Sequence, residues 1–149
     1  MENLDIFEVA CKYFFQKISE FKEILSNKVR ALENIDWIYD KGTTKVCQPD
    51  EKDKRKRCKT GLEYRSKVEI SPDDVETIWE EFNAFFEKTY TADIERISTN
   101  EEIGRYEFMA TNSKGDRFQC MIYLSGEWNI PLVYLSAFVT ARYKNVDYV

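Results

Sequence analysis

Residues 62–86, LEYRSKVEISPDDVETIWEEFNAFF, decide the fold. The first part, residues 62–70, alternates apolar and charged side chains, which is the pattern of a half-buried strand. Ser71 then offers an N-cap hydroxyl, Pro72 suits the first helical position, and two aspartates follow where the helix dipole favours negative charge. From there to about Lys88 the apolar residues recur at helical spacing. The segment therefore predicts a strand followed directly by an amphipathic helix.

One side of this predicted helix is an aromatic stripe, made of Val75, Ile78, Trp79, Phe82, Phe85 and Phe86. A stripe of this width is typical of a helix that packs on a sheet, and a ligand pocket lined by it is the alternative. The other side holds Glu76, Glu80 and Glu87, which cluster at about 100° per residue. We call these three residues the acidic stripe and predict that they face solvent.

The rest of the chain extends this pattern in an α+β order. A long N-terminal helix is predicted from about Leu4 to Glu33, where apolar residues recur at helical spacing without Gly or Pro. The strands expected besides 62–70 are 35–41 and 43–47, paired with each other, then 90–97, 103–111, 116–124 and 130–143. The predicted fold class is α+β, a single domain over residues 1–149 with two helices packed on an antiparallel meander sheet.

Composition places the chain among globular domains. It has 149 residues, of which 43% are hydrophobic, 15% aromatic and 33% charged. A domain of this size buries about two-thirds of its unfolded surface and needs no metal or disulfide to fold. No run of about 18 uncharged apolar residues occurs, so the sequence predicts no transmembrane segment.

The sequence offers few candidate catalytic groups. The sequence contains no His, which excludes Ser-His-Asp and Cys-His nucleophiles and His-ligated zinc or haem. It also lacks a Walker lysine, GxGxxG, GxSxG and an acidic calcium loop. We therefore predict a domain that is not an enzyme and holds no cofactor or metal. A hydrolase whose carboxylate pair is assembled only by the fold is the alternative.

The net charge of −5 is unevenly distributed. Residues 51–59 contain six bases and two acids, a local charge of +4, so the other 140 residues carry −9. We predict that this basic run is a solvated loop tip. The acidic remainder disfavours nucleic acid and favours a basic protein partner, with simple solubility as the alternative explanation.

The four cysteines match no zinc pattern, because neither CxxC nor His accompanies them. Cys11 and Cys120 are predicted to be small buried hydrophobes. Cys47 and Cys58 flank a polar stretch of ten residues. They are a disulfide candidate, and the bridge would form only in an oxidising compartment.

Alternation along strands 103–111 and 116–124 separates two faces of the predicted sheet. The second face offers Met109, Met121 and Tyr123 among single charges. Methionine and tyrosine are common at recognition surfaces, and also on any half-exposed sheet. We treat these three residues, together with the acidic stripe, as candidate partner-binding residues.

The order of several motifs resembles that of the LppA-type lipoproteins. The motifs are a long helix that begins near residues 5–8, the Trp37 strand, Gly42 to Cys47, Ile70 to Asp74 with Trp79, Ile103 to Tyr106, and Lys114 to Asp116. These proteins are small α+β envelope domains that normally follow a signal peptide and a lipid-modified cysteine. Here Met1 to Leu4 leads into the predicted helix without a basic n-region or lipobox. The resemblance implies an extracytoplasmic location if an export segment has been removed, and a cytoplasmic one otherwise.

The architecture also resembles small acidic immunity proteins, which neutralise a toxin of interbacterial competition. These proteins pack a helix on an antiparallel sheet and present a strongly charged face. Both resemblances imply a protein-binding domain that binds or neutralises a protein partner, for example a toxin, and the acidic charge of the chain favours a basic one. The alternative is a small-molecule or lipid-binding envelope domain that uses the space between the aromatic stripe and the sheet.

Overall fold

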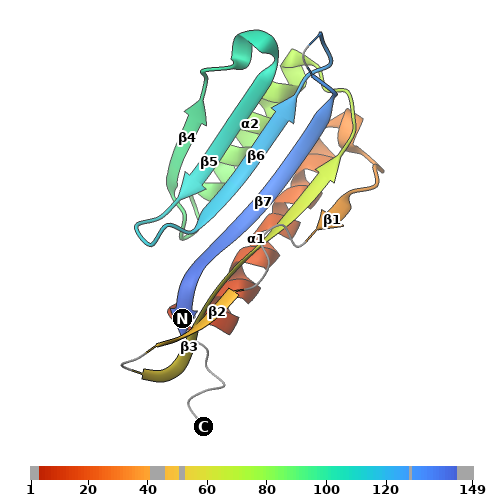
Figure 1. Cartoon of the computed structure of the whole chain (residues 1–149). Helices are drawn as coiled ribbons and strands as arrows, with labels where there is room; N and C mark the ends of the chain where they lie inside the picture. The colour runs from red at the N-terminus through yellow and green to blue at the C-terminus, as the bar shows by residue number, and fades with distance from the viewer. Residues whose placement is uncertain (1–3, 41–45, 51–52, 128, 144–149) are drawn as a thin grey trace.

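The computed structural model describes residues 4–40, 46–50, 53–127 and 129–143. Two α-helices lie on one face of a seven-stranded antiparallel sheet, as in the predicted α+β class (Figure 1). In the view of Figure 1 the strands lie in front and both helices lie behind them. No described helix covers the other face of the sheet, which we call the open face.

The elements follow the expected order of helices and strands. They are α1 (Phe7–Lys28), the 3-10 turn η1 (Arg30–Leu32), β1 (Ile38–Asp40), β2 (Val46–Asp50), β3 (Asp53–Ser66), α2 (Pro72–Phe86), β4 (Asp93–Ile97), the 3-10 turn η2 (Glu101–Ile103), β5 (Arg105–Thr111), β6 (Arg117–Tyr123) and β7 (Leu132–Tyr143). The strand order is β1-β3-β7-β6-β5-β4, and β2 also pairs with β3. Strands β4 to β7 form a meander, whereas β3 lies beside β7 because α2 takes the chain behind the sheet to its far edge (Figure 1).

The first helix is shorter than the predicted range 4–33. Its regular part ends at Lys28, and Val29 takes an extended conformation before η1. Leu25, Val29 and Leu32 continue the helical spacing and are all buried, although the backbone changes between them. Periodicity alone therefore overextends the helix, because the burial pattern persists beyond its end.

The second helix begins as predicted. Ser71 Oγ accepts a hydrogen bond from the Asp74 backbone N–H at 3.1 Å, and the Asp74 carboxylate accepts one from the Ser71 N–H at 3.4 Å. This reciprocal capping box satisfies two backbone donors that the first turn leaves without helical partners. The helix ends at Phe86, two residues before the predicted Lys88.

The aromatic stripe packs on the sheet, as predicted. The Trp79 ring centroid lies 4.9 Å from that of Phe108, and Phe86 lies 4.5 Å from Phe118. Phe21 of α1 lies 5.1 Å from Phe86 and connects the two helices. These contacts occupy the space in which the alternative ligand pocket was predicted.

The strands before residue 60 differ from the prediction. Strand β1 is confined to three residues of the predicted 35–41, and residues 43–45 of the next predicted strand lie outside the described residues. Strand β2 pairs with β3, and the predicted pairing with the preceding strand is wrong. The reason is that β3 extends much further toward the N-terminus than the sequence indicates, and offers β2 an edge.

Residues 53–59 of the basic run are part of a strand, so the predicted loop tip is wrong for them, and residues 51 and 52 lie outside the described residues. Strand β3 includes residues 53–59 and ends at Ser66, four residues before the predicted end at Ile70. Arg57 and Cys58 pair with Tyr143 and Arg142 of β7, while β2 pairs along the other side. Backbone hydrogen bonds to two neighbours favour the strand even where the side chains have low strand propensity.

The last four strands agree with the prediction except that each starts one to three residues later and β6 ends one residue earlier, at Tyr123. The predicted hairpin turn joins β5 to β6. Asn112 Oδ1 accepts the backbone N–H groups of Lys114 and Asp116 at 3.0 and 3.1 Å. Gly115 has φ +88°, a left-handed conformation that glycine adopts without strain.

We expect Ser71→Ala to lower the free energy of unfolding by about 1 kcal/mol, because the substitution removes the N-cap acceptor and one half of the capping box. Urea denaturation followed by far-UV circular dichroism measures this change. Ser113→Ala is the matched control, since Ser113 is exposed in a turn and caps no helix. Equal stability of the two variants would show that the cap contributes nothing.

Candidate functional site

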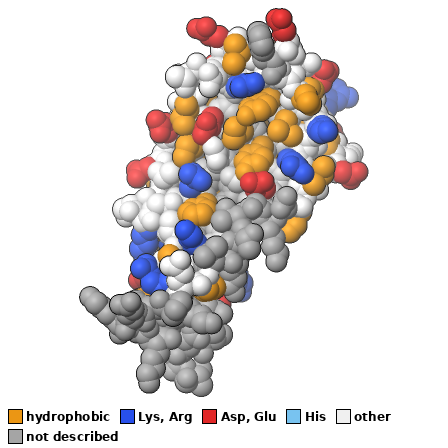
Figure 2. Space-filling model, in the orientation of Figure 1, with side chains coloured by type: hydrophobic (Ala, Val, Ile, Leu, Met, Phe, Trp, Pro, Cys, Tyr) orange, Lys and Arg blue, Asp and Glu red, His pale blue; other side chains and the backbone are white. Residues whose placement is uncertain are grey.

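The three sheet residues predicted to contact a partner lie together on the open face. Met109, Met121 and Tyr123 are half-buried and alternate with buried residues that point toward the helices. Met121 lies opposite Glu107 of β5 on one side and Tyr134 of β7 on the other. Figure 2 shows this side of the molecule, where apolar side chains are scattered among Lys, Arg, Asp and Glu.

Polar groups near the centre of the open face are paired within the face. Tyr134 Oη donates to the Glu63 carboxylate, and Gln119 Nε2 donates to Glu107 Oε2 at 2.6 Å. Burial and the neighbouring Glu63 raise the pKa of Tyr134, so its hydroxyl stays protonated. The methionines are therefore surrounded by polar groups whose hydrogen bonds are already partly satisfied.

The acidic stripe does not join these residues. It lies on α2, behind the sheet in Figure 1, so the sheet separates it from the open face. Glu80 and Glu87 are exposed, as predicted. The two candidate sets thus lie on opposite sides of the sheet.

Glu76 departs from the prediction of a purely solvent-facing charge. Its two carboxylate oxygens accept hydrogen bonds from Nη1 and Nη2 of Arg96, both at 2.8 Å. The hydrogen bond from Arg96 lowers the pKa of Glu76. Because this bidentate ion pair neutralises Glu76, the acidic stripe is effectively reduced to Glu80 and Glu87.

Arg96 connects three elements. Besides Glu76 of α2, it donates through Nε to Glu101 of η2 at 2.7 Å. Its guanidinium carbon also lies 5.5 Å from the ring centroid of Phe108. Hydrogen bonds to the two glutamates raise the pKa of Arg96. Arg96 follows Glu76 by twenty positions, which explains why sequence spacing did not indicate this pair.

A hollow at one end of the open face was not predicted. We call it the basic hollow; it has a volume of about 570 Å³ and is lined by Ile38, Arg65, Lys67, Arg105, Tyr123, Asn129, Ile130 and Leu132. These residues come from β1, β3, β5, β6 and β7 and from the segments that follow β3 and precede β7. No local motif could have revealed them, because only the strand order brings them together.

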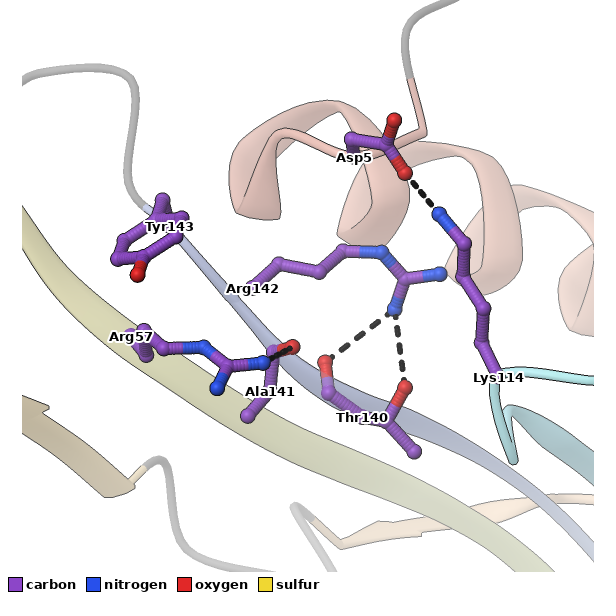
Figure 3. A pocket seen from close by; sticks show the side chains of 7 residues that line it. All are labelled: Asp5, Arg57, Lys114, Thr140, Ala141, Arg142 and Tyr143. Atoms are coloured by element: carbon purple, nitrogen blue, oxygen red, sulfur yellow. Dashed lines mark hydrogen bonds and ion pairs between the residues drawn. The ribbon is translucent and has the colours of Figure 1, made fainter.

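A second hollow, of about 530 Å³, lies at the other end of β7 (Figure 3). Its cationic side chains are already engaged. Lys114 contacts Asp5, Arg57 Nη2 donates to the Ala141 carbonyl at 3.1 Å, and Arg142 donates to the Leu4 carbonyl. The groups around this hollow therefore join the N-terminal segment to β7.

Asp116 and Arg142 form a buried ion pair beside this second hollow, with side chains 0% and 5% exposed. Asp116 Oδ1 accepts from Arg142 Nη1 at 2.7 Å and from the Thr140 N–H at 2.9 Å, while Asn112 Nδ2 donates to Oδ2 at 3.0 Å. Burial alone would raise the pKa of Asp116, but these hydrogen bonds outweigh it and the pKa is lowered. Asp116 is thus an ionised structural group.

The structure joins Cys47 and Cys58 in a disulfide between β2 and β3, where the two residues are directly opposite each other. Cys120 is buried, as predicted, and burial raises the pKa of its thiol. Cys11 is only half-buried, so the prediction of a buried side chain is wrong for it. Cys11 lies on α1 beside the buried Ala10 and points partly to solvent.

Two features are absent from the part of the chain that the structure describes. No group of three or more Asp, Glu, Cys or His side chains among the described residues could hold a metal ion. None of the described helices is long and apolar enough to cross a membrane, in agreement with the prediction from the sequence.

Comparisons with known proteins give one structural similarity. No family model matches the sequence, and no curated protein matches it. The chain is similar to the solved structure of a DUF4853 family protein from Actinomyces odontolyticus, with a TM-score of 0.47 and 9% sequence identity. That similarity covers 87% of this chain and 67% of the other.

We expect Asp116→Asn to reduce the free energy of unfolding by about 3 kcal/mol or more, because it leaves the Arg142 charge buried without a counter-charge. The pKa of Asp116 is lower in the folded protein than in the unfolded chain, where it is about 4, so the ionised carboxylate stabilises the fold above this pH. This contribution is lost as the pH falls through the folded-state pKa. Urea denaturation between pH 2 and 7 should therefore show that the free energy of unfolding falls less on acidification in the variant than in the wild type.

Asp5→Asn is the control for this experiment. Asp5 contacts Lys114 at the surface, where its side chain is 74% exposed, so solvent screening leaves little stabilisation to lose. Similar losses in the two variants would contradict a special role for the buried pair.

Proposed function

We propose that this domain acts by binding a protein partner through the open face of its sheet, and not by catalysis. The observation that supports this most directly is the position of Met121. It lies near the centre of the open face, with Met109 and Tyr123 on the same side. An adaptable methionine surrounded by tyrosine and paired polar groups is typical of a surface that excludes water against another protein.

The shape of the face also suits a protein. Strands β5, β6 and β7 present a broad surface with no described helix over it, whereas a small ligand requires an enclosing pocket. A stable interface needs about 800 Å² from each partner, which a sheet face can supply and a single side-chain cluster cannot.

For the partner, we propose a basic protein that the domain neutralises or sequesters, as an immunity protein does with a toxin or as an LppA-like envelope domain would. The net charge of −5 supports this, because it attracts a basic protein over distances longer than a contact. Glu80 and Glu87 contribute to that attraction from behind the sheet. They would therefore affect the rate of association more than the stability of the complex.

We expect Met121→Glu to weaken binding of the partner by at least about thirtyfold, because it places a charge near the centre of the interface beside Glu107. The partner is first captured from source cells by the immobilised wild-type domain. Binding of the purified partner to the wild type and the variant is then compared by surface plasmon resonance.

Glu80→Lys combined with Glu87→Lys is the matched control, since both residues are exposed on the opposite side. This double variant should keep its dissociation rate and associate several-fold more slowly at low salt, with a smaller effect above about 0.15 M salt. If the double variant lost the partner while Met121→Glu retained it, the interface would lie on α2 and the proposal would be wrong.

We also propose an extracytoplasmic location, which the Cys47–Cys58 disulfide supports because such bonds persist in oxidising compartments. Mass spectrometry without reduction, on protein isolated from its native cells, should find these two cysteines linked. Cys11 and Cys120, which the structure leaves as thiols, should take up an alkylating reagent after unfolding and so provide an internal control. Free thiols at Cys47 and Cys58 would place the domain in a reducing compartment.

A further inference from the structure

The basic hollow has an unusual charge balance for an acidic protein. Arg65, Lys67 and Arg105 line it, and none of the other described lining residues has a carboxylate. Arg65 and Lys67 are both exposed. In the second hollow, by contrast, Lys114 contacts a carboxylate, as does Arg142. The basic hollow is therefore a positive site within a protein of net charge −5.

Apolar side chains stand next to these cations. Ile38 and Ile130 are 50% and 70% exposed, and both line the hollow together with Leu132. Covering large exposed aliphatic side chains with a ligand is favourable, because it removes their apolar surface from water. A ligand that suits the hollow must therefore provide both negative charge and apolar groups.

The position of Arg105 is fixed by its neighbours. Its Nε donates to Asn129 Oδ1 at 2.7 Å, and Asn129 Nδ2 donates in turn to the Ile103 carbonyl at 2.5 Å. The Arg105 guanidinium carbon also lies 5.3 Å from the ring centroid of Tyr123. A guanidinium held in this way loses little conformational entropy when it meets an anion.

Gly104 allows this arrangement. It has φ +77°, and a Cβ at this position would lie 3.2 Å from Asn129 Nδ2. A larger residue would therefore strain the backbone and press on the amide that orients Arg105. The local backbone is thus compatible with an ordered cationic site.

We propose that the basic hollow binds an acidic segment of the protein partner, in which carboxylates alternate with apolar side chains. This inference rests on the proposed function, because Tyr123 belongs both to the hollow and to the open face. Arg65 and Lys67 would contact the carboxylates, and Ile38 and Ile130 the apolar side chains. An Arg–carboxylate pair can form two parallel hydrogen bonds and so adds specificity to charge attraction.

A locally acidic segment is compatible with a partner of net positive charge. The net charges of the two proteins influence how they approach each other. A pair of contacting charges acts within a few ångströms and is screened beyond a Debye length of about 8 Å at physiological salt. The acidic surface of the domain would therefore attract the partner, and the basic hollow would then fix the orientation in which the partner binds.

The test uses the full chain and two synthetic octapeptides labelled with fluorescein, one of alternating Glu and Leu and one of alternating Gln and Leu. Fluorescence anisotropy measures their affinities, and methyl NMR spectra locate the site. We expect the Glu peptide to bind at least about tenfold more tightly than the Gln peptide, since two charge pairs are lost in the latter. Its addition should shift the methyl signals of Ile38, Ile130 and Leu132.

Arg65→Gln combined with Lys67→Gln should weaken binding of the Glu peptide by about tenfold, for the same reason. Arg117→Gln is the matched control, because Arg117 is exposed on β6 outside the hollow, near the Phe138 ring. It should bind the peptide as the wild type does. The NMR mapping uses only the wild type, so it stays decisive even if the double variant fails to fold.

Several results would overturn this proposal. They are equal affinity for the Glu and Gln peptides, absence of methyl shifts at the hollow, or unchanged binding by the double variant. Sedimentation with phosphatidylcholine vesicles that contain phosphatidylserine tests the other source of anionic and apolar groups. Vesicle binding that depends on Arg65 and Lys67, without peptide binding, would show a lipid site and also overturn the proposal.

The outcome separates this inference from the proposed function. If Met121→Glu abolishes partner binding while the peptide binds nowhere, the open face is the interface and the hollow proposal is wrong. If the peptide binds the hollow while Met121→Glu leaves partner binding unchanged, the hollow is an acidic-peptide site and the proposed interface is wrong.

Discussion

Phe21, Phe86 and Phe118 form a continuous series of ring contacts from α1 through α2 to β6. The centroid distances are 5.1 Å between the first two and 4.5 Å between the last two, and all three rings are fully buried. Each buried aromatic ring removes about 150–250 Å² from water, so these contacts stabilise both helices against the same side of the sheet. No described helix covers the open face in this way, and its exposed side chains must be compatible with water.

The two hollows at the ends of β7 show how the same residue types serve different purposes. Around the second hollow, Arg142 meets the fully buried Asp116, and the pair holds the β5–β6 turn against β7. Removing one partner there would leave a buried charge. Around the basic hollow, Arg65 and Lys67 remain in water, so their loss would cost little stability. Because these two charged side chains contribute little to folding, they can serve in binding without a large loss of stability.

Patterns within one element, or between two strands joined by a hairpin, could be predicted from the sequence. The cap at Ser71 depends on residues three positions apart, and the shared face of Met109 and Met121 depends only on the two-residue period of strands and on antiparallel pairing. The pairing of Glu76 with Arg96 and the assembly of the basic hollow depend on strand order instead. That order could not be predicted, because α2 moves the chain from β3 to the far edge of the sheet.

The basic run shows the same limit for secondary structure. Six cations in nine residues predict a solvated loop when the segment is considered alone. In the structure residues 53–59 belong to a strand that pairs with β2, and from Arg57 onward the same strand also pairs with β7. Local propensity is worth about 1 kcal/mol at most per residue, so tertiary pairing readily reverses it.

The edges of the sheet bear on where a partner can bind. Strand β4 is five residues long and exposes Asp93 and Glu95, and β1 at the other edge has only three residues. Short and charged edge strands disfavour the addition of a strand from another chain. Arg96 also holds β4 to α2 and η2, which ties this edge into the fold. Recognition by strand addition is thereby discouraged at β4 and β1, which agrees with the proposal that a partner binds the broad surface around Met121 instead.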